Sequence, residues 1–142
     1  MQVTVESFAQ APLEAVWQAW TTPDEIMKWN AAAPDWRTTQ AEVDLRVGGA
    51  FRWRIEARDG SVGYDVEGVY TELRPLRRLA ARSGDHMMRV SFLPEDGGVR
   101  VVETFDVDDP QVAAEQCQGH QAVLDRFCRH VAMRAAPLEC PV

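Results

Sequence analysis

Two residues far apart in the chain, Glu103 and His120, have side chains that could move protons together. Glu103 occupies an alternate position of a strand-like segment whose other members on that face are apolar, namely Val99, Val101 and Phe105. A carboxylate on a buried face needs a partner or loses its charge, and an imidazole exchanges protons near neutral pH. We therefore predict a Glu103–His120 pair that faces one cavity. The alternatives are a register that turns Val102 and Thr104 inward, a Glu103 that lies near the open end in water, and a His120 that is only a hydrogen-bonded core residue.

Aromatic side chains supply a second candidate site, for an apolar ligand. All five tryptophans lie within the first 53 residues, at Trp17, Trp20, Trp29, Trp36 and Trp53. Trp53 alternates with Phe51 and Ile55 opposite a charged strand face, so it is the best placed of the five to line a pocket. The predicted lining residues are Phe51, Trp53, Tyr64, Tyr70, Met88, His120, Leu124 and Phe127. For the two tyrosines, cross-strand packing is the alternative.

The sequence contains little that indicates a metal or a cofactor. Cys117 and His120 have a helical spacing that would suit two ligands, but two ligands are too few for a tetrahedral site. The remaining histidines, His86 and His130, are expected to be exposed. There is no phosphate-binding glycine loop, no dinucleotide fingerprint and no nucleophile motif. We therefore predict no metal site and no cofactor.

Strands and helices must position these residues. Alternation of apolar and polar residues, broken by turn residues, predicts seven strands, at 3–9, 36–45, 50–58, 62–73, 78–83, 87–93 and 99–107. Apolar residues at helical spacing predict two short helices between residues 13 and 30. A long helix is expected from Asp109-Pro110 to about Ala135, with Pro137 marking its end.

Two local signals refine these elements. Thr22 and Glu25 have the spacing of a capping box at the start of the second helix. Gly68, inside a long strand, indicates a bulge or a sharp bend that would help the sheet to curl.

This order of elements predicts an α+β fold of the helix-grip type. Consecutive strands joined by tight turns form an antiparallel sheet, and the long helix has one apolar stripe to bury. A curved sheet wrapped around that helix satisfies both requirements. Because a strongly curved sheet cannot close everywhere on a single helix, we expect a cavity between them.

Bulk properties narrow the functional classes. The 142 residues suit a single domain spanning 1–142. A net charge of −7 and a pI near 4.9 disfavour nucleic acid and anionic membranes as partners. The N-terminus lacks the features of a signal peptide, no apolar run is long enough to span a bilayer, and three cysteines suit a reducing compartment. These features predict a cytoplasmic protein without membrane insertion.

Several sequence segments resemble a known family. The most specific is residues 44–53, DLRVGGAFRW; further matching positions are Ala11-Pro12, Trp17, Ala19-Trp20-Thr21, Pro23-Asp24, Trp29, Asp59-Gly60, Gly68, Tyr70, Leu73, Pro75, Leu79, Gly119 and Leu124. Together they resemble the helix-grip superfamily of START domains, the birch-pollen allergen and polyketide cyclases. Within it, the chain is similar to the branch named after the Aha-type activator of a heat-shock chaperone ATPase.

The chain departs from this branch at two places. His120 stands where a tryptophan is frequent, and Trp29-Asn30 replaces a tandem tryptophan. Both changes make the expected cavity more polar. The resemblance implies a ligand cavity, whereas the chaperone role belongs to larger eukaryotic relatives that carry a second domain.

Three functions follow as expectations. The first is binding of a small, largely apolar molecule, without catalysis. The second is an enzyme of the cyclase or hydratase type, in which His120 and Glu103 move protons. The third is an interaction module that contacts a chaperone or regulator through the outward charges Arg52, Arg54 and Glu56. A homodimer is compatible with each.

Overall fold

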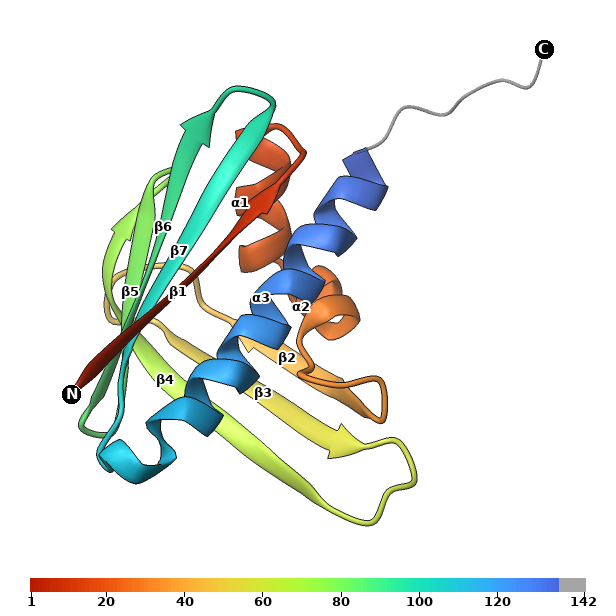
Figure 1. Cartoon of the computed structure of the whole chain (residues 1–142), viewed down its shortest axis with the longest axis vertical. Coiled ribbons are helices and arrows are strands. Elements are labelled where there is room, and N and C mark those ends of the chain that lie inside the picture. The colour runs from red at the N-terminus through yellow and green to blue at the C-terminus, as the bar shows by residue number, and fades with distance from the viewer. Residues whose placement is uncertain (136–142) are drawn as a thin grey trace.

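The computed structural model describes residues 1–135, which form one curled sheet and the helices it encloses (Figure 1). The strands are β1 (Gln2–Ala9), β2 (Trp36–Val43), β3 (Ala50–Ala57), β4 (Gly63–Arg74), β5 (Arg78–Ser83), β6 (His86–Glu95) and β7 (Gly98–Asp106). The helices are α1 (Leu13–Thr21), α2 (Pro23–Trp29), the short 3-10 turn η1 (Pro110–Val112) and α3 (Ala113–Ala135). Each predicted strand is present, with ends within two residues of those expected.

The sheet is antiparallel throughout, in the order β1-β7-β6-β5-β4-β3-β2. The first strand therefore pairs with the last, and β2 forms the opposite edge. Figure 1 shows α3 crossing the inside of this curl, with α1 and α2 beside its C-terminal half. This confirms the predicted helix-grip architecture.

The space between the sheet and α3 is filled at one end by aromatic packing. Trp20 and Trp29 each meet the ring of Phe127 edge to face, with ring centroids 4.9 and 4.8 Å apart. The indole nitrogen of Trp29 donates to the carbonyl oxygen of Ala19 at 2.8 Å, which satisfies its only polar atom. Leu124, Phe127, Cys128 and Val131 of α3 are buried. The C-terminal half of α3 thus lies in a packed core, and any cavity must lie against its N-terminal half.

Gly68 has a different structural role from the one expected. A Cβ at this position would lie 2.5 Å from Cε1 of Phe51, so the ring of Phe51 packs directly on the backbone of β4. The shift in register lies between Tyr70 and Glu72, beyond the glycine. An irregularity in this strand was correctly expected, but its location at Gly68 was wrong, because the glycine makes room for a neighbouring ring.

The helix ends also differ in detail. Asp109 caps as expected, since its Oδ1 accepts from the amide of Gln111 at 2.9 Å, but the first turn is the 3-10 segment η1. The capping box is wrong: the Thr22 side chain makes no capping hydrogen bond, and Glu25 bonds to α3 instead. The expected end of the helix at Pro137 lies outside the described residues.

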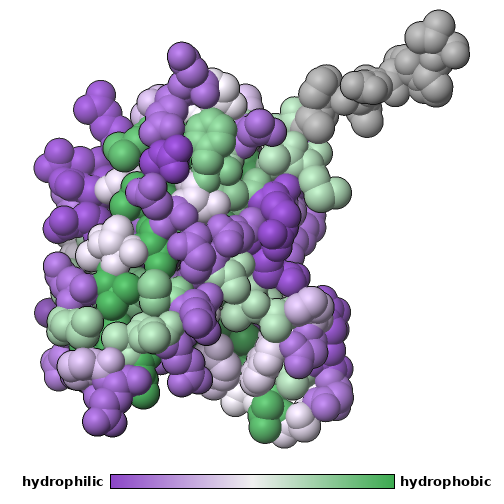
Figure 2. Space-filling view, in the orientation of Figure 1, coloured by the Kyte–Doolittle hydropathy of each residue, from purple (hydrophilic) through white to green (hydrophobic). Residues whose placement is uncertain are grey.

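Figure 2 shows hydrophilic and hydrophobic side chains interspersed on the face that carries α3. Among the helices of residues 1–135, none combines the length and apolar character required to cross a bilayer.

Candidate functional site

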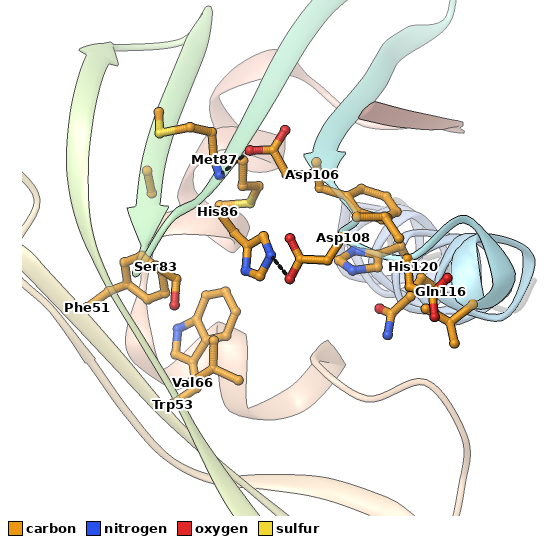
Figure 3. Close-up of a pocket in the computed structure, with 16 residues that line it drawn as sticks. Phe51, Trp53, Val66, Ser83, His86, Met87, Asp106, Asp108, Gln116 and His120 are labelled. Atoms are coloured by element: carbon orange, nitrogen blue, oxygen red, sulfur yellow. Dashed lines mark hydrogen bonds and ion pairs between the residues drawn. The ribbon is translucent and has the colours of Figure 1, made fainter. Parts of the chain in front are cut away.

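A cavity of about 460 Å³ lies between the N-terminal half of α3 and the sheet. Figure 3 shows Phe51, Trp53, Val66 and Ser83 on its sheet side and Gln116 and His120 on its helix side. The remaining lining residues belong to β5, β6, β7 and the segment that follows: Ala81, His86, Met87, Met88, Phe105, Asp106, Val107, Asp108, Asp109 and Val112. The walls are mainly aromatic and aliphatic, and the polar groups gather at the end of β7.

The predicted pair of Glu103 and His120 is formed. Glu103 Oε1 and His120 Nδ1 are 2.6 Å apart. Alternation along β7 places Glu103 inward, 6% exposed, opposite Val5 on one neighbouring strand and Val90 on the other. Because both cross-strand neighbours are valines, His120 is the polar group that satisfies this carboxylate.

The geometry of the pair fixes which ring nitrogen faces Glu103. An ionised carboxylate only accepts, so Nδ1 is the donor to it, and Nε2 is an acceptor when the ring is neutral and a donor when the ring is protonated. The ring is stacked on Phe105, with centroids 3.7 Å apart and planes at 17°. His120 therefore has two restraints on its orientation, while its side chain stays 38% exposed on the cavity wall. Such a histidine can hydrogen-bond a ligand or accept a proton from it.

A second histidine–carboxylate pair lies at the mouth of the cavity. His86 Nε2 lies 2.8 Å from Asp108 Oδ2, and both side chains are exposed. Beside it, Asp106 Oδ2 accepts from the backbone amide of Met87 at 2.8 Å (Figure 3). His86 is exposed as expected, but its contact with Asp108 was not expected. The available signal was the group of three aspartates at the end of an alternating strand, at positions 106, 108 and 109.

The other predicted lining residues divide into two groups. Phe51, Trp53 and Met88 line the cavity together with His120. The remaining four do not: Tyr64, Tyr70, Leu124 and Phe127 lie outside its lining. Leu124 and Phe127 belong to the filled core. Tyr64 is 51% exposed and lies 6.0 Å from Trp36, ring to ring.

Tyr70 is buried behind the cavity wall. Its ring lies 5.4 Å from that of Phe51, and burial raises the pKa of its phenol to about 12. It supports the wall and keeps its proton at neutral pH.

Trp53 carries an unusual feature for a residue on an apolar wall. Its indole Nε1 is fully buried and has no hydrogen-bond partner within residues 1–135. A buried donor without an acceptor is costly, so such groups in folded proteins call for an explanation. Strand alternation predicted that Trp53 lines the cavity, but a missing acceptor has no signal in the sequence.

A third histidine joins α3 to α2, away from the cavity. His130 Nε2 lies 2.6 Å from Glu25 Oε2, and Arg134 lies 3.0 Å from Glu25 Oε1. The expectation that His130 is exposed was wrong, since its side chain and that of Glu25 are largely buried. The two residues are 105 positions apart, and no local pattern predicted their contact.

The outward charges of β3 are paired within the chain. Arg52 lies 3.2 Å from Asp65 and 3.4 Å from Glu67, and Arg54 lies 3.2 Å from Glu56. These exposed pairs contribute little to stability. The outer face of β3 and β4 therefore carries charges of both signs. No group of three or more metal-ligating side chains with suitable geometry occurs in the part of the chain that the structure describes.

The wrapped sheet, the long helix and the cavity between them define a protein of the helix-grip class. Residues 10–132 match the family model of the Activator of Hsp90 ATPase homolog 1-like proteins, and the chain belongs to this family. The family resemblance drawn from the sequence is thereby confirmed.

Solved structures agree with this assignment. The solution NMR structure of an AHSA1-like protein from Aeromonas hydrophila is 40% identical over 100% of both chains, with a TM-score of 0.90. Chr148 from Cytophaga hutchinsonii is 33% identical over 94% of this chain and 93% of its own, with a TM-score of 0.79. NE0264 from Nitrosomonas europaea, at 18% identity, 94% and 96% coverage and a TM-score of 0.81, shares the fold. No curated protein matches the chain.

Proposed function

We propose that this domain binds a small molecule with a flat, largely apolar body in the cavity against the first half of α3. The observation that carries the proposal is a cavity of about 460 Å³ walled by the rings of Phe51, Trp53 and Phe105, with His120 on its helix side. Ligand pockets in proteins have volumes of about 300 to 1,000 Å³, apolar walls and a few convergent polar groups. This cavity has all three properties.

The aromatic walls favour a flat ligand. Phe51 and Trp53 lie with ring centroids 4.9 Å apart on one side, and Phe105 and His120 are stacked on the other. An aromatic or polycyclic body placed between these pairs would bury apolar area and pack against ring faces.

The polar groups favour a ligand that also carries a hydrogen-bonding group. The imidazole of His120 stays 38% exposed on the cavity wall, and its Nε2 can accept a hydrogen bond when the ring is neutral. A ligand hydroxyl or amine would then donate to Nε2.

Native mass spectrometry of freshly purified protein, compared with its denatured mass, tests this proposal. A reproducible added mass that disappears on denaturation is expected. The substitution Val66→Trp fills the cavity and should abolish the added mass, whereas Val62→Trp, which is exposed just before β4, should retain it. Retention of the added mass in Val66→Trp would place the ligand elsewhere.

A second function, proton transfer to or from the bound molecule, is favoured by the restrained His120–Glu103 pair. A histidine with Nδ1 fixed on a carboxylate and Nε2 on a cavity wall has the arrangement of a general base. In a cyclase- or hydratase-type reaction, His120 would accept a proton and Glu103 would stabilise the resulting imidazolium. Incubation of the identified ligand with protein tests it: conversion that is lost in His120→Ala would establish catalysis, and recovery of unchanged ligand would leave binding alone.

A further inference from the structure

The charges around the cavity are mainly negative. Among the described residues that line it there is no arginine or lysine, whereas three are aspartates: Asp106, Asp108 and Asp109. The two histidines are each already matched with a carboxylate, His86 with Asp108 and His120 with Glu103.

The excess negative charge persists even when both histidines are protonated. Four carboxylates, counting Glu103 behind His120, would then face two imidazolium groups and the ammonium of Met1, which donates to the carbonyl oxygen of Val107 at 3.0 Å. A net charge of −1 remains. Asp106 is the last residue of β7, and Asp108 and Asp109 follow within three residues, so the negative charge is concentrated at this end of the cavity. Two of these carboxylates are held in place by backbone amides, Asp106 by Met87 and Asp109 by Gln111.

This arrangement decides which ligand charge the cavity favours. An organic anion would enter past these aspartates and find no arginine or lysine among the described lining residues, which is unfavourable inside a partly desolvated site. A protonated amine would meet carboxylates at the mouth while its aromatic body lies against Phe51, Trp53 and Phe105. Aromatic ring faces also attract cations.

From these observations, and resting on the proposed binding function, we infer that the cavity selects aromatic amines in their protonated, cationic form over neutral and anionic analogues. The cavity supplies the apolar contact, and the aspartates at the end of β7 supply the charge selection.

Three probes of nearly equal size test the inference: 2-(1-naphthyl)ethylamine, 2-(1-naphthyl)ethanol and 1-naphthylacetate. Their dissociation constants are measured by isothermal titration calorimetry at pH 7.5 in low and high salt. The amine should bind roughly tenfold more tightly than the alcohol at low salt, and the carboxylate should bind more weakly than both. The preference for the amine should shrink as salt is added.

Variants that remove negative charges test which carboxylates cause the preference for the amine. Replacing Asp106→Asn and Asp108→Asn together keeps one acceptor oxygen at each position, removes both charges and should reduce the preference for the amine to less than threefold. Asp96→Asn, on the turn at the far end of β6, changes the total charge in the same direction and should leave the preference unchanged.

The outcomes separate the two proposals. An amine that binds no tighter than the alcohol or the carboxylate, while any probe binds, overturns the charge selection and leaves the binding function standing. Absence of binding by all three probes overturns both. A preference that survives in the double variant overturns the role of the aspartates.

Discussion

The imidazole of His120 is held by two residues of the same strand: it is stacked on Phe105 and hydrogen-bonded to Glu103 at 2.6 Å. Glu103 and Phe105 are two positions apart on β7, so both side chains face inward. One strand therefore provides a flat surface and a charged partner for one histidine of α3. This arrangement fixes which ring nitrogen is available to the cavity.

We predict that His120→Ala destabilises the domain by about 2 kcal/mol. The substitution leaves the carboxylate of Glu103 buried between two valines without a partner, and it removes the stacking on Phe105. Adding Glu103→Val removes the unpaired charge, so the double variant should be more stable than His120→Ala alone. Urea unfolding of the three proteins measures this. A double variant less stable than the single one would show that Glu103 is satisfied in some other way.

Gly68→Ala should destabilise the domain by about 1–3 kcal/mol. The added Cβ would collide with the ring of Phe51, which is buried and cannot retreat without disturbing the cavity wall. Gly119→Ala is the matched control: nothing lies within 4 Å of its Cβ position, and alanine favours helix, so stability should rise by up to about 1 kcal/mol. Thermal unfolding of both variants tests the pair, and equal effects would contradict the packing argument.

The sequence predicted the face on which a residue lies better than its position relative to the cavity. Alternation along β7 correctly turned Glu103 inward, and helical spacing correctly placed His120 on the stripe that faces the sheet. The same stripe includes Leu124, which lies one turn further along α3 and is in the filled core. Periodicity assigns a residue to a face, but it does not say where along the helix axis the sheet diverges enough to leave a cavity.

Tyr64 illustrates the same limit on the sheet. It shares a face of β4 with the cavity residue Val66, yet it is exposed because the hairpin of β3 and β4 extends beyond α3 (Figure 1). The contact of Glu25 with His130 was also unpredictable, because it depends on the tertiary placement of α2 against α3.

We predict that Glu25→Ala destabilises the domain by about 1–2 kcal/mol. Glu25 is largely buried and bonds to two residues of α3, so its loss leaves His130 without its partner and weakens the contact between α2 and α3. Glu14→Ala, which removes an exposed glutamate from α1, should change stability by less than about 0.5 kcal/mol. Guanidinium unfolding compares the two. A similar small effect for both would mean that the buried cluster contributes nothing net.

The domain should lose stability in alkaline solution through two buried groups. Burial raises the pKa of the Tyr70 phenol from 10 to about 12 and that of the Cys128 thiol from 9 to about 11. Between the ordinary and raised values the unfolded chain releases these protons and the folded chain keeps them. The unfolded state then binds fewer protons, so the free energy of unfolding falls as pH rises.

Tyr70→Phe isolates one of these contributions. At pH 11 the phenol is mostly ionised in the unfolded chain, whose pKa of 10 lies one unit below, and mostly protonated in the folded chain, whose pKa of about 12 lies one unit above. It should therefore account for about 1.4 kcal/mol of the stability lost between pH 8 and pH 11. The variant should therefore lose about 1.4 kcal/mol less than the wild-type domain between pH 8 and pH 11, as measured by urea unfolding at each pH. Tyr64→Phe, at an exposed position of the same strand, should lose as much as wild type. An equal loss for Tyr70→Phe and the wild-type domain would contradict this prediction. It would mean that the phenol of Tyr70 ionises equally easily in the folded and unfolded states, despite its burial behind Phe51.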